Sequence, residues 1–169
     1  MARIIRHQLG FFHADNAVIV GEVVIGEDAN FWFGSVVRGD VARIEIGRRV
    51  NVQDGVLIHA DSGNPVMIED DVSIGHGAVI HGQRIGQGTL VGMGARIMGR
   101  SIIGRECIIG GGAVVPPGMV VPDRTVVLGV PAGVARPVSD KDLEHLRWLP
   151  GHYVQLAWKW TRGEFASVI

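Results

Sequence analysis

The chain has 169 residues, enough for one domain or for one domain with a short appendage. Its formal net charge of −1 gives no basic field for a nucleic-acid backbone or an anionic membrane, so neither kind of partner is expected. Hydrophobic residues make up 47% of the chain and aromatic residues only 6%, so the core must be built mainly from aliphatic side chains.

The N-terminal segment lacks the features of a secretory signal, because Arg3, Arg6 and His7 interrupt any apolar run. The longest uncharged stretch, residues 107–122, contains three consecutive glycines and three prolines and is not expected to span a bilayer. A single cysteine excludes an internal disulfide. We therefore expect a cytoplasmic protein, since the reducing cytoplasm is the default compartment for such a chain.

From residue 19 onward, a buried-type side chain recurs every six positions. Three short runs come first: Ile19, Ile25, Phe31 and Val37; Ile46, Val52 and Ile58; Ile68, Ile74 and Ile80. An unbroken series follows: Ile85, Val91, Ile97, Ile103, Ile109, Val115, Val121 and Val127. Four residues after each member of this series from Ile85 to Val121 lies a mostly small side chain: Thr89, Ala95, Ser101, Cys107, Ala113, Met119 and Thr125. A period of six is typical of a solenoid, with the aliphatic residue toward the axis and the small one beside a corner.

The period slips at three places, which sets the register of the coils. Val37 to Ile46 is three residues too long, Ile58 to Ile68 is four too long, and Ile80 to Ile85 is one too short. We expect the two insertions, residues 38–43 ("RGDVAR") and 60–67 ("ADSGNPVM"), to form loops that bulge from corners.

The repeat ends after Val134, and a helical pattern follows. Ser139 and Asp142 have the spacing of a capping box. An amphipathic stripe then follows at spacings of three or four: Leu143, Leu146, Leu149, Tyr153, Leu156 and Trp160. Pro150-Gly151 is expected to break or kink this segment into two helices. We therefore divide the chain into a solenoid domain, residues 1–135, and a C-terminal helical segment, residues 136–169, that packs on the solenoid's flank.

Counting along the coils places two histidines together. Val37, Ile58 and Ile80 fall on one face of consecutive coils, and Arg38, His59 and His81 each come directly after them. These three side chains should stack in one column at the inter-strand spacing of about 4.8 Å. Two imidazoles so placed can converge on one ion at about 2.0–2.1 Å each. Chance stacking of two histidines is the competing interpretation.

His76 belongs to another face. It lies two residues after Ile74, one coil along from Asp54, which is next to Gln53. It cannot easily complete the His59 and His81 pair within one chain, so a third ligand must come from elsewhere. Three copies around a threefold axis would set the first face of one against the third face of its neighbour and give three equivalent intersubunit sites. The remaining histidines, His7, His13, His145 and His152, are interpreted as ordinary surface or core residues.

Several motifs of this chain resemble those of the gamma class of carbonic anhydrases and their close relatives. They are "RGD" (residues 38–40), "NVQDGVLIH" (51–59), "GHGAVIHG" (75–82), "VGMGA" (91–95) and "GVPAG" (129–133), the last shared with many hexapeptide-repeat acyltransferases. The resemblance covers nearly the whole chain. It implies an all-β fold, a left-handed parallel β-helix of hexapeptide repeats with a C-terminal α-helical segment. It also implies a homotrimer in which His59 and His81 of one subunit and His76 of the next bind zinc.

The resemblance further implies a reaction and roles for polar residues. Zinc-bound hydroxide would hydrate carbon dioxide to bicarbonate, with Gln53 hydrogen-bonded to that hydroxide and Asn51 nearby. Arg38 and Asp40 would form a polar network across the subunit contact, or only an ion pair that holds the trimer together. Zinc is the first expectation for the cofactor, although imidazole also suits iron or cobalt. Tyr153 either packs or reaches the cleft.

The chain departs from the family pattern where a proton shuttle is expected. The best-studied members carry a Glu directly after "RGD" and an acidic loop after the first zinc histidine, whereas this chain has Val41 and a short loop with Asp61. Hydration is therefore expected to be slow, or the protein has another role. The alternatives are a metal-dependent thioesterase of the phenylacetate-pathway type and a non-catalytic metal-binding scaffold trimer. A coenzyme A acyltransferase is less favoured, because it uses histidine as a base without metal.

Overall fold

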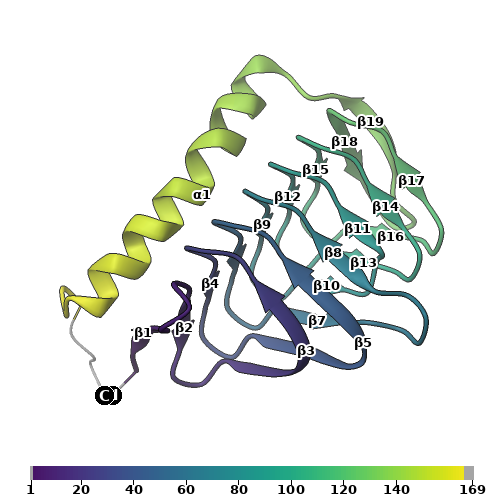
Figure 1. Ribbon diagram of the computed structural model, residues 1–169. Coiled ribbons are helices and arrows are strands. Elements are labelled where there is room, and N and C mark those ends of the chain that lie inside the picture. Colours follow the sequence, from purple (N-terminus) through teal and green to yellow (C-terminus); the bar gives the residue numbers. More distant parts are fainter. Residues whose placement is uncertain (1, 166–169) are drawn as a thin grey trace.

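The computed structural model describes residues 2–165 and shows a three-sided solenoid flanked by one long helix (Figure 1). Parallel strands stack coil upon coil, so the predicted left-handed β-helix of hexapeptide repeats is confirmed. Within the described residues, no helix is both long and apolar enough to cross a membrane.

One sheet forms the third face of the prism. Its strands, in spatial order, are β1 (Ile4–Arg6), β2 (Phe12–Ala14), β4 (Asn30–Phe31), β6 (Asn51–Val52), β9 (Ser73–Ile74), β12 (Leu90–Val91), β15 (Ile108–Ile109), β18 (Thr125–Leu128) and β19 (Gly133–Pro137). The pairs β1–β2 and β18–β19 are antiparallel, and the pairs between them are parallel.

A second sheet wraps around the other two faces. Its order is β16 (Val114–Val115), β13 (Arg96–Ile97), β10 (Val79–Ile80), β7 (Leu57–His59), β5 (Val36–Ile46), β8 (Val66–Ile68), β11 (Arg84–Ile85), β14 (Ile102–Ile103) and β17 (Val120–Val121), and β3 (Val18–Ile25) pairs with β5. The strands from β16 to β7 form the first face and those from β8 to β17 the second. β5 belongs to both, because it continues around the corner between them.

The strand register confirms the columns that were counted from the sequence. Val37 pairs with Ile58 and Ile58 with Ile80 on the first face, while Ile46 pairs with Ile68 on the second and Val52 with Ile74 on the third. All of these side chains are buried and form one continuous core. Cys107 also lies in the core, and burial raises the pKa of its thiol, as expected for a packing residue.

The first insertion lies within a strand and not in a separate loop, and the second is shorter than predicted. Residues 38–43 belong to β5, a strand of 11 residues, but the register against β3 shifts at the corner: Gly39 pairs with Gly21 and Ile44 with Val23, so the three extra residues bulge there as expected. The two strands approach very closely at Gly21 and Gly39, where a Cβ on Gly21 would lie 2.4 Å from the Gly39 backbone. The second insertion is a tight turn closed by a bridge between Asp61 and Asn64, and β8 resumes at Val66.

The C-terminal stripe forms one helix rather than two. α1 (Asp140–Thr161) continues through a buried Pro150, so the expected break is wrong. Both halves pack on the solenoid side, through Leu143 and Leu146 in one half and through Leu156 and Ala157 in the other. This packing outweighs the roughly 3 kcal/mol that a proline costs in a helix interior. The predicted boundary at residue 135 falls inside β19, and the division into two domains stays a prediction.

Replacing Ser139 with alanine should destabilise the protein by about 1 kcal/mol. The Ser139 hydroxyl accepts a hydrogen bond from the Asp142 amide, the Asp142 carboxylate accepts one from the Ser139 amide, and Arg136 pairs with the same carboxylate. The Arg136 and Ser139 contacts lower the pKa of Asp142, so the cap is fully formed at neutral pH and weakens only in strong acid. Urea unfolding at pH 7 and fixed protein concentration measures the loss. Ser62→Ala, at an exposed loop position, is the control, and equal stability of the two variants would contradict the cap.

Candidate metal centre

The predicted histidine column is present on the outer surface of the first face. Arg38 and His59 are register partners in β5 and β7, and His81 follows directly on β10, whose Ile80 pairs with Ile58. Because the aliphatic residue of each strand points inward, the residue after it points outward. The His59 side chain is 16% exposed and that of His81 is 26% exposed, so the pair is set into the surface.

The two imidazoles face one another through single nitrogen atoms. His59 Nδ1 lies 3.1 Å from His81 Nε2, and the ring centroids are 5.2 Å apart with a tilt of 42°. When both rings are neutral, the protonated one of these two nitrogens donates a hydrogen bond to the other. A cation could replace that proton, since two nitrogens that bind zinc at 2.0–2.1 Å in a tetrahedral site are about 3.3 Å apart.

Carboxylates approach the other ring nitrogens. Asp61 Oδ2 lies 3.2 Å from His81 Nδ1, and the tight turn that Asp61 begins holds it there. Asp40 Oδ1 lies 3.3 Å from His59 Nε2, outside hydrogen-bond geometry, and this nitrogen is a buried side-chain atom with no hydrogen-bond partner among residues 2–165. A carboxylate on one nitrogen of an imidazole favours the proton there and leaves the opposite nitrogen free as a ligand. These two histidines therefore fit a cation between them.

His76 lies on the third face, as predicted, and is paired there. Its Nδ1 is 2.7 Å from Asp54 Oδ2, and its side chain is 47% exposed. The Nε2 atom of His76 is not used in this pair and is available to bind a metal ion. Over the described part of one chain, no three histidine, cysteine or acidic side chains are close enough to hold a metal ion. The structure brings His59 and His81 together, but not His76.

Amide side chains beside His76 form an ordered chain on the same face. Gln53 Nε2 donates to Asn51 Oδ1 at 2.9 Å, and Asn51 Nδ2 donates to Ser73 Oγ at 2.7 Å. All three residues are buried. Ser73 was not singled out from the sequence, although its place one coil beyond Asn51 is set by the same register. The chain fixes the Gln53 amide so that its oxygen is the group left free.

Arg38 and Asp40 form an ion pair at the edge of the column. Arg38 Nη1 lies 2.7 Å from Asp40 Oδ2, and both side chains are about half exposed. The hydrogen bond from Arg38 lowers the pKa of Asp40, which therefore stays charged near His59. Both residues belong to β5, at the corner where its register against β3 shifts.

Tyr153 of α1 packs in the hydrophobic cluster under the helix and lies near the candidate site. Its ring meets Trp32 edge to face at 5.4 Å, within a second hydrophobic cluster beneath the helix. Burial raises the pKa of Tyr153, and the nearby charge of Asp54 raises it further. Tyr153 therefore packs, and it also lies near the charge of Asp54, the partner of His76.

Comparison with known proteins assigns the family. The chain is 47% identical over 144 residues to a protein named carbonic anhydrase from Geobacillus kaustophilus, covering 85% of this chain and 79% of that one. It is 33% identical over 152 residues to gamma carbonic anhydrase 2, mitochondrial, of Arabidopsis thaliana, covering 86% of this chain and 55% of the plant protein. The chain belongs to the gamma-carbonic-anhydrase-like family of hexapeptide-repeat proteins.

Other similarities of this chain are to proteins with transferase names. Residues 84–117 match the family described as "Bacterial transferase hexapeptide (six repeats)". The chain also resembles a crystal structure from Bacillus cereus titled putative acetyltransferase, with a TM-score of 0.88, 36% identity and coverage of 90% of this chain and 89% of that one. Family membership alone therefore does not determine which reaction the protein catalyses.

Proposed function

We propose that the protein is a trimeric, zinc-dependent carbonic anhydrase that interconverts carbon dioxide and bicarbonate. The observation that carries this proposal is the pair of imidazole nitrogens, His59 Nδ1 and His81 Nε2, that face one another at 3.1 Å. The 47% identity to a protein named carbonic anhydrase supports the same reaction. Iron or cobalt would also suit imidazole ligands.

The surface around the column supports a subunit contact on the first face. Outward-pointing side chains of neighbouring strands form an apolar column, because Val18 pairs with Val36, Val36 with Leu57 and Leu57 with Val79. Val18 and Leu57 are exposed in the single chain. A second copy that covers these residues with its third face would bury the apolar column and bring its own His76 toward His59 and His81.

The protein residues would position the reactants around that ion. When bound, zinc would supply a Lewis acid that makes water a nucleophile at neutral pH. Gln53 and His76 share the third face, so both would reach the site from the same neighbouring subunit. The Gln53 amide NH2 donates a hydrogen bond to Asn51, and its oxygen is left to accept a hydrogen bond from the attacking water and so to orient that water toward carbon dioxide.

The described residues near the proposed site include few groups that could carry a proton to solvent. The Asp61 carboxylate contacts His81, and the Asp40 carboxylate is held by Arg38. Val41 is exposed at the position directly after Asp40 and cannot carry a proton. We therefore expect buffer molecules to take up the proton, and the turnover number to rise with buffer concentration until chemistry becomes limiting.

The test combines metal analysis of the purified protein with stopped-flow hydration of carbon dioxide in increasing buffer. We expect about one metal ion per subunit and a turnover number that increases with buffer. Bound metal with cleavage of acyl-coenzyme A but no hydration would support a thioesterase, a reaction that the acetyltransferase title of the similar B. cereus structure makes worth testing. Bound metal with neither activity would leave a binding scaffold, and absence of metal would refute the proposal.

A further inference from the structure

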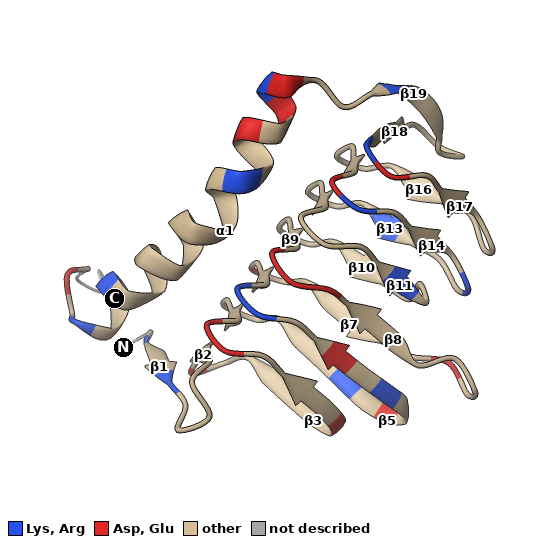
Figure 2. Cartoon of the chain, turned by 45° about the horizontal axis from the view of Figure 1, so that its top comes forward, with Lys and Arg blue, Asp and Glu red and all other residues tan. Residues whose placement is uncertain are grey.

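A groove separate from the histidine column lies between α1 and the corner where the second face turns into the third. Its volume is about 780 Å³, within the range of small-molecule sites. Corner residues of successive coils form one wall, and Leu146, Arg147 and Gly151 of α1 form the other. Figure 2 shows the charged corners along this edge of the solenoid, facing the helix. We call this feature the corner groove.

The charges of successive corners pair with one another, but the pairing is interrupted within the corner groove. Arg49 binds Asp71 of the next coil at 2.7 Å, whereas the following corner, Gln87-Gly88, carries no charge. Gly88 has a φ of +68°, yet Asp71 at +61° and Glu106 at +50° hold side chains in the same conformation on either side. The backbone therefore does not demand glycine here. The missing side chain opens a hollow in the wall of the groove.

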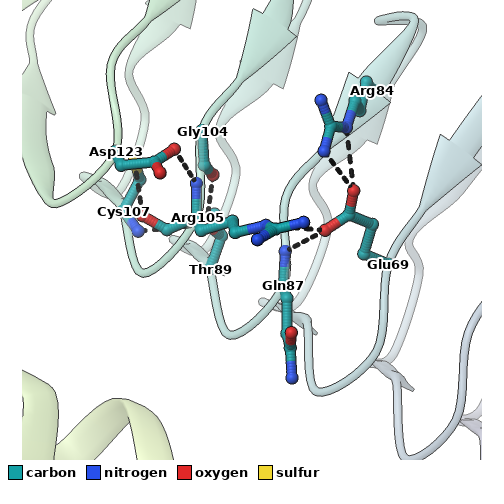
Figure 3. Close-up of polar contacts among 8 residues, drawn as sticks. All are labelled: Glu69, Arg84, Gln87, Thr89, Gly104, Arg105, Cys107 and Asp123. Atoms are coloured by element: carbon teal, nitrogen blue, oxygen red, sulfur yellow. Dashed lines mark hydrogen bonds and ion pairs between the residues drawn. The ribbon is translucent and has the colours of Figure 1, made fainter.

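Two arginines at this hollow, Arg105 and Arg147, each lie near a carboxylate that is already bound more closely by another arginine. Glu69 is bound by Arg84 and lies 3.5 Å from Arg105, as Figure 3 shows. Glu106 is bound by Arg124 at 2.7 Å and lies 3.5 Å from Arg147 of α1. The side chains of Arg105 and Arg147 are 57% and 66% exposed. Both can therefore turn toward a ligand without leaving a carboxylate unpaired.

The other groups of the groove favour a small molecule that carries an anionic group on an otherwise polar body. The carboxylates on its walls are already engaged, since Asp71 is held by Arg49 and Asp123 accepts a hydrogen bond from the Arg105 amide. The exposed Gln87 side chain extends away from its corner (Figure 3) and lines the groove. Two guanidinium groups on opposite walls can both donate hydrogen bonds to one tetrahedral phosphate, because its oxygens can accept from both sides.

We propose that the corner groove binds a phosphorylated small molecule, with Arg105 and Arg147 contacting the phosphate and Gln87 contacting the polar remainder. None of these residues belongs to the proposed metal centre, so the result of testing one proposal does not decide the other. Bound phosphate would also bridge α1 to the solenoid. Binding should therefore raise the melting temperature of the protein.

Isothermal titration of the full-length protein with pyrophosphate, and separately with citrate, tests the proposal. We expect saturable binding of pyrophosphate in the micromolar to low millimolar range and markedly weaker binding of citrate. Arg105→Gln and Arg147→Gln should each weaken pyrophosphate binding by about 10- to 100-fold, the usual loss for a hydrogen bond to a charged group. Arg162→Gln is the matched control, because Arg162 is similarly exposed but pairs with Glu164 away from the groove.

A second variant tests the hollow itself. Gly88→Asn keeps a residue type that tolerates positive φ but fills the space, so it should abolish binding while Arg105 and Arg147 remain. Circular dichroism and metal content should match the wild type. Failure of pyrophosphate to bind, equal affinity for citrate, or unchanged binding in the Arg105, Arg147 or Gly88 variants would overturn the assignment.

Discussion

Mixed trimers of His76→Ala and His81→Ala subunits should regain about one third of the wild-type carbon dioxide hydration activity, although each variant alone is inactive. In the proposed metal centre, each site would need the histidine column of one subunit and His76 of the next. The His76→Ala subunit supplies the intact column, and the His81→Ala subunit supplies the intact His76. Around a ring of three, either mixed composition contains one such ordered pair. Co-expression with two affinity tags, tandem purification and stopped-flow assay give the measurement.

A matched pair of variants provides the control for this experiment. His59→Ala and His81→Ala both damage the column of the same chain, so no arrangement of these subunits rebuilds a complete site. Their mixed trimers should be as inactive as each variant alone. Recovery in this control, or none with His76→Ala and His81→Ala, would contradict a metal centre shared between subunits.

Removing the Asp61 side chain should weaken zinc binding by about 10- to 100-fold, the usual effect of losing a carboxylate behind a metal-binding histidine. Asp61 lies 3.2 Å from His81 Nδ1 and favours the proton on that nitrogen, which leaves Nε2 to face His59. Asp61→Ala removes the carboxylate beside His81, whereas Asp61→Asn keeps an oxygen but loses the charge. The affinities should therefore fall in the order wild type, Asn variant, Ala variant, as measured by competition with a chelator.

Asp15→Ala is the control for this series, because Asp15 is exposed and makes no ion pair among residues 2–165. It should bind zinc like the wild type. If Asp61→Ala retains full zinc affinity while the trimer is intact, Asp61 does not position His81, and another group must fix the orientation of that ring.

The sequence was a good guide to the coils, because a period of six determines which residue points inward. One rule of counting placed Val37, Ile58 and Ile80 in one column and thereby stacked His59 beneath His81. The corner at residues 38–43 could be predicted only in part in this way. The count gives the number of extra residues there, but not that they stay within β5, whose pairing with β3 stops at Gly39 and resumes at Ile44. Likewise, the continuity of α1 through Pro150 depends on packing against the solenoid.

In the candidate site, too, the repeat predicted some features, and tertiary contacts determine the others. Spacing predicted which histidines share a face, but not which ring nitrogen each carboxylate contacts. The contact between Asp61 and His81 depends on the turn of residues 61–64, and the contact of Tyr153 with Trp32 depends on where α1 lies. The corner groove was not predicted from the sequence, since one of its walls is a helix whose place on the solenoid the repeat does not specify.

The buried position of Cys107 makes the chain convenient for site-specific chemistry. Its thiol is inaccessible, and its raised pKa keeps it protonated, so alkylating dyes should leave the native protein unlabelled. A single cysteine introduced on the surface would then be the sole attachment point for a fluorophore. Donor- and acceptor-labelled batches, once mixed, would report how quickly protomers exchange.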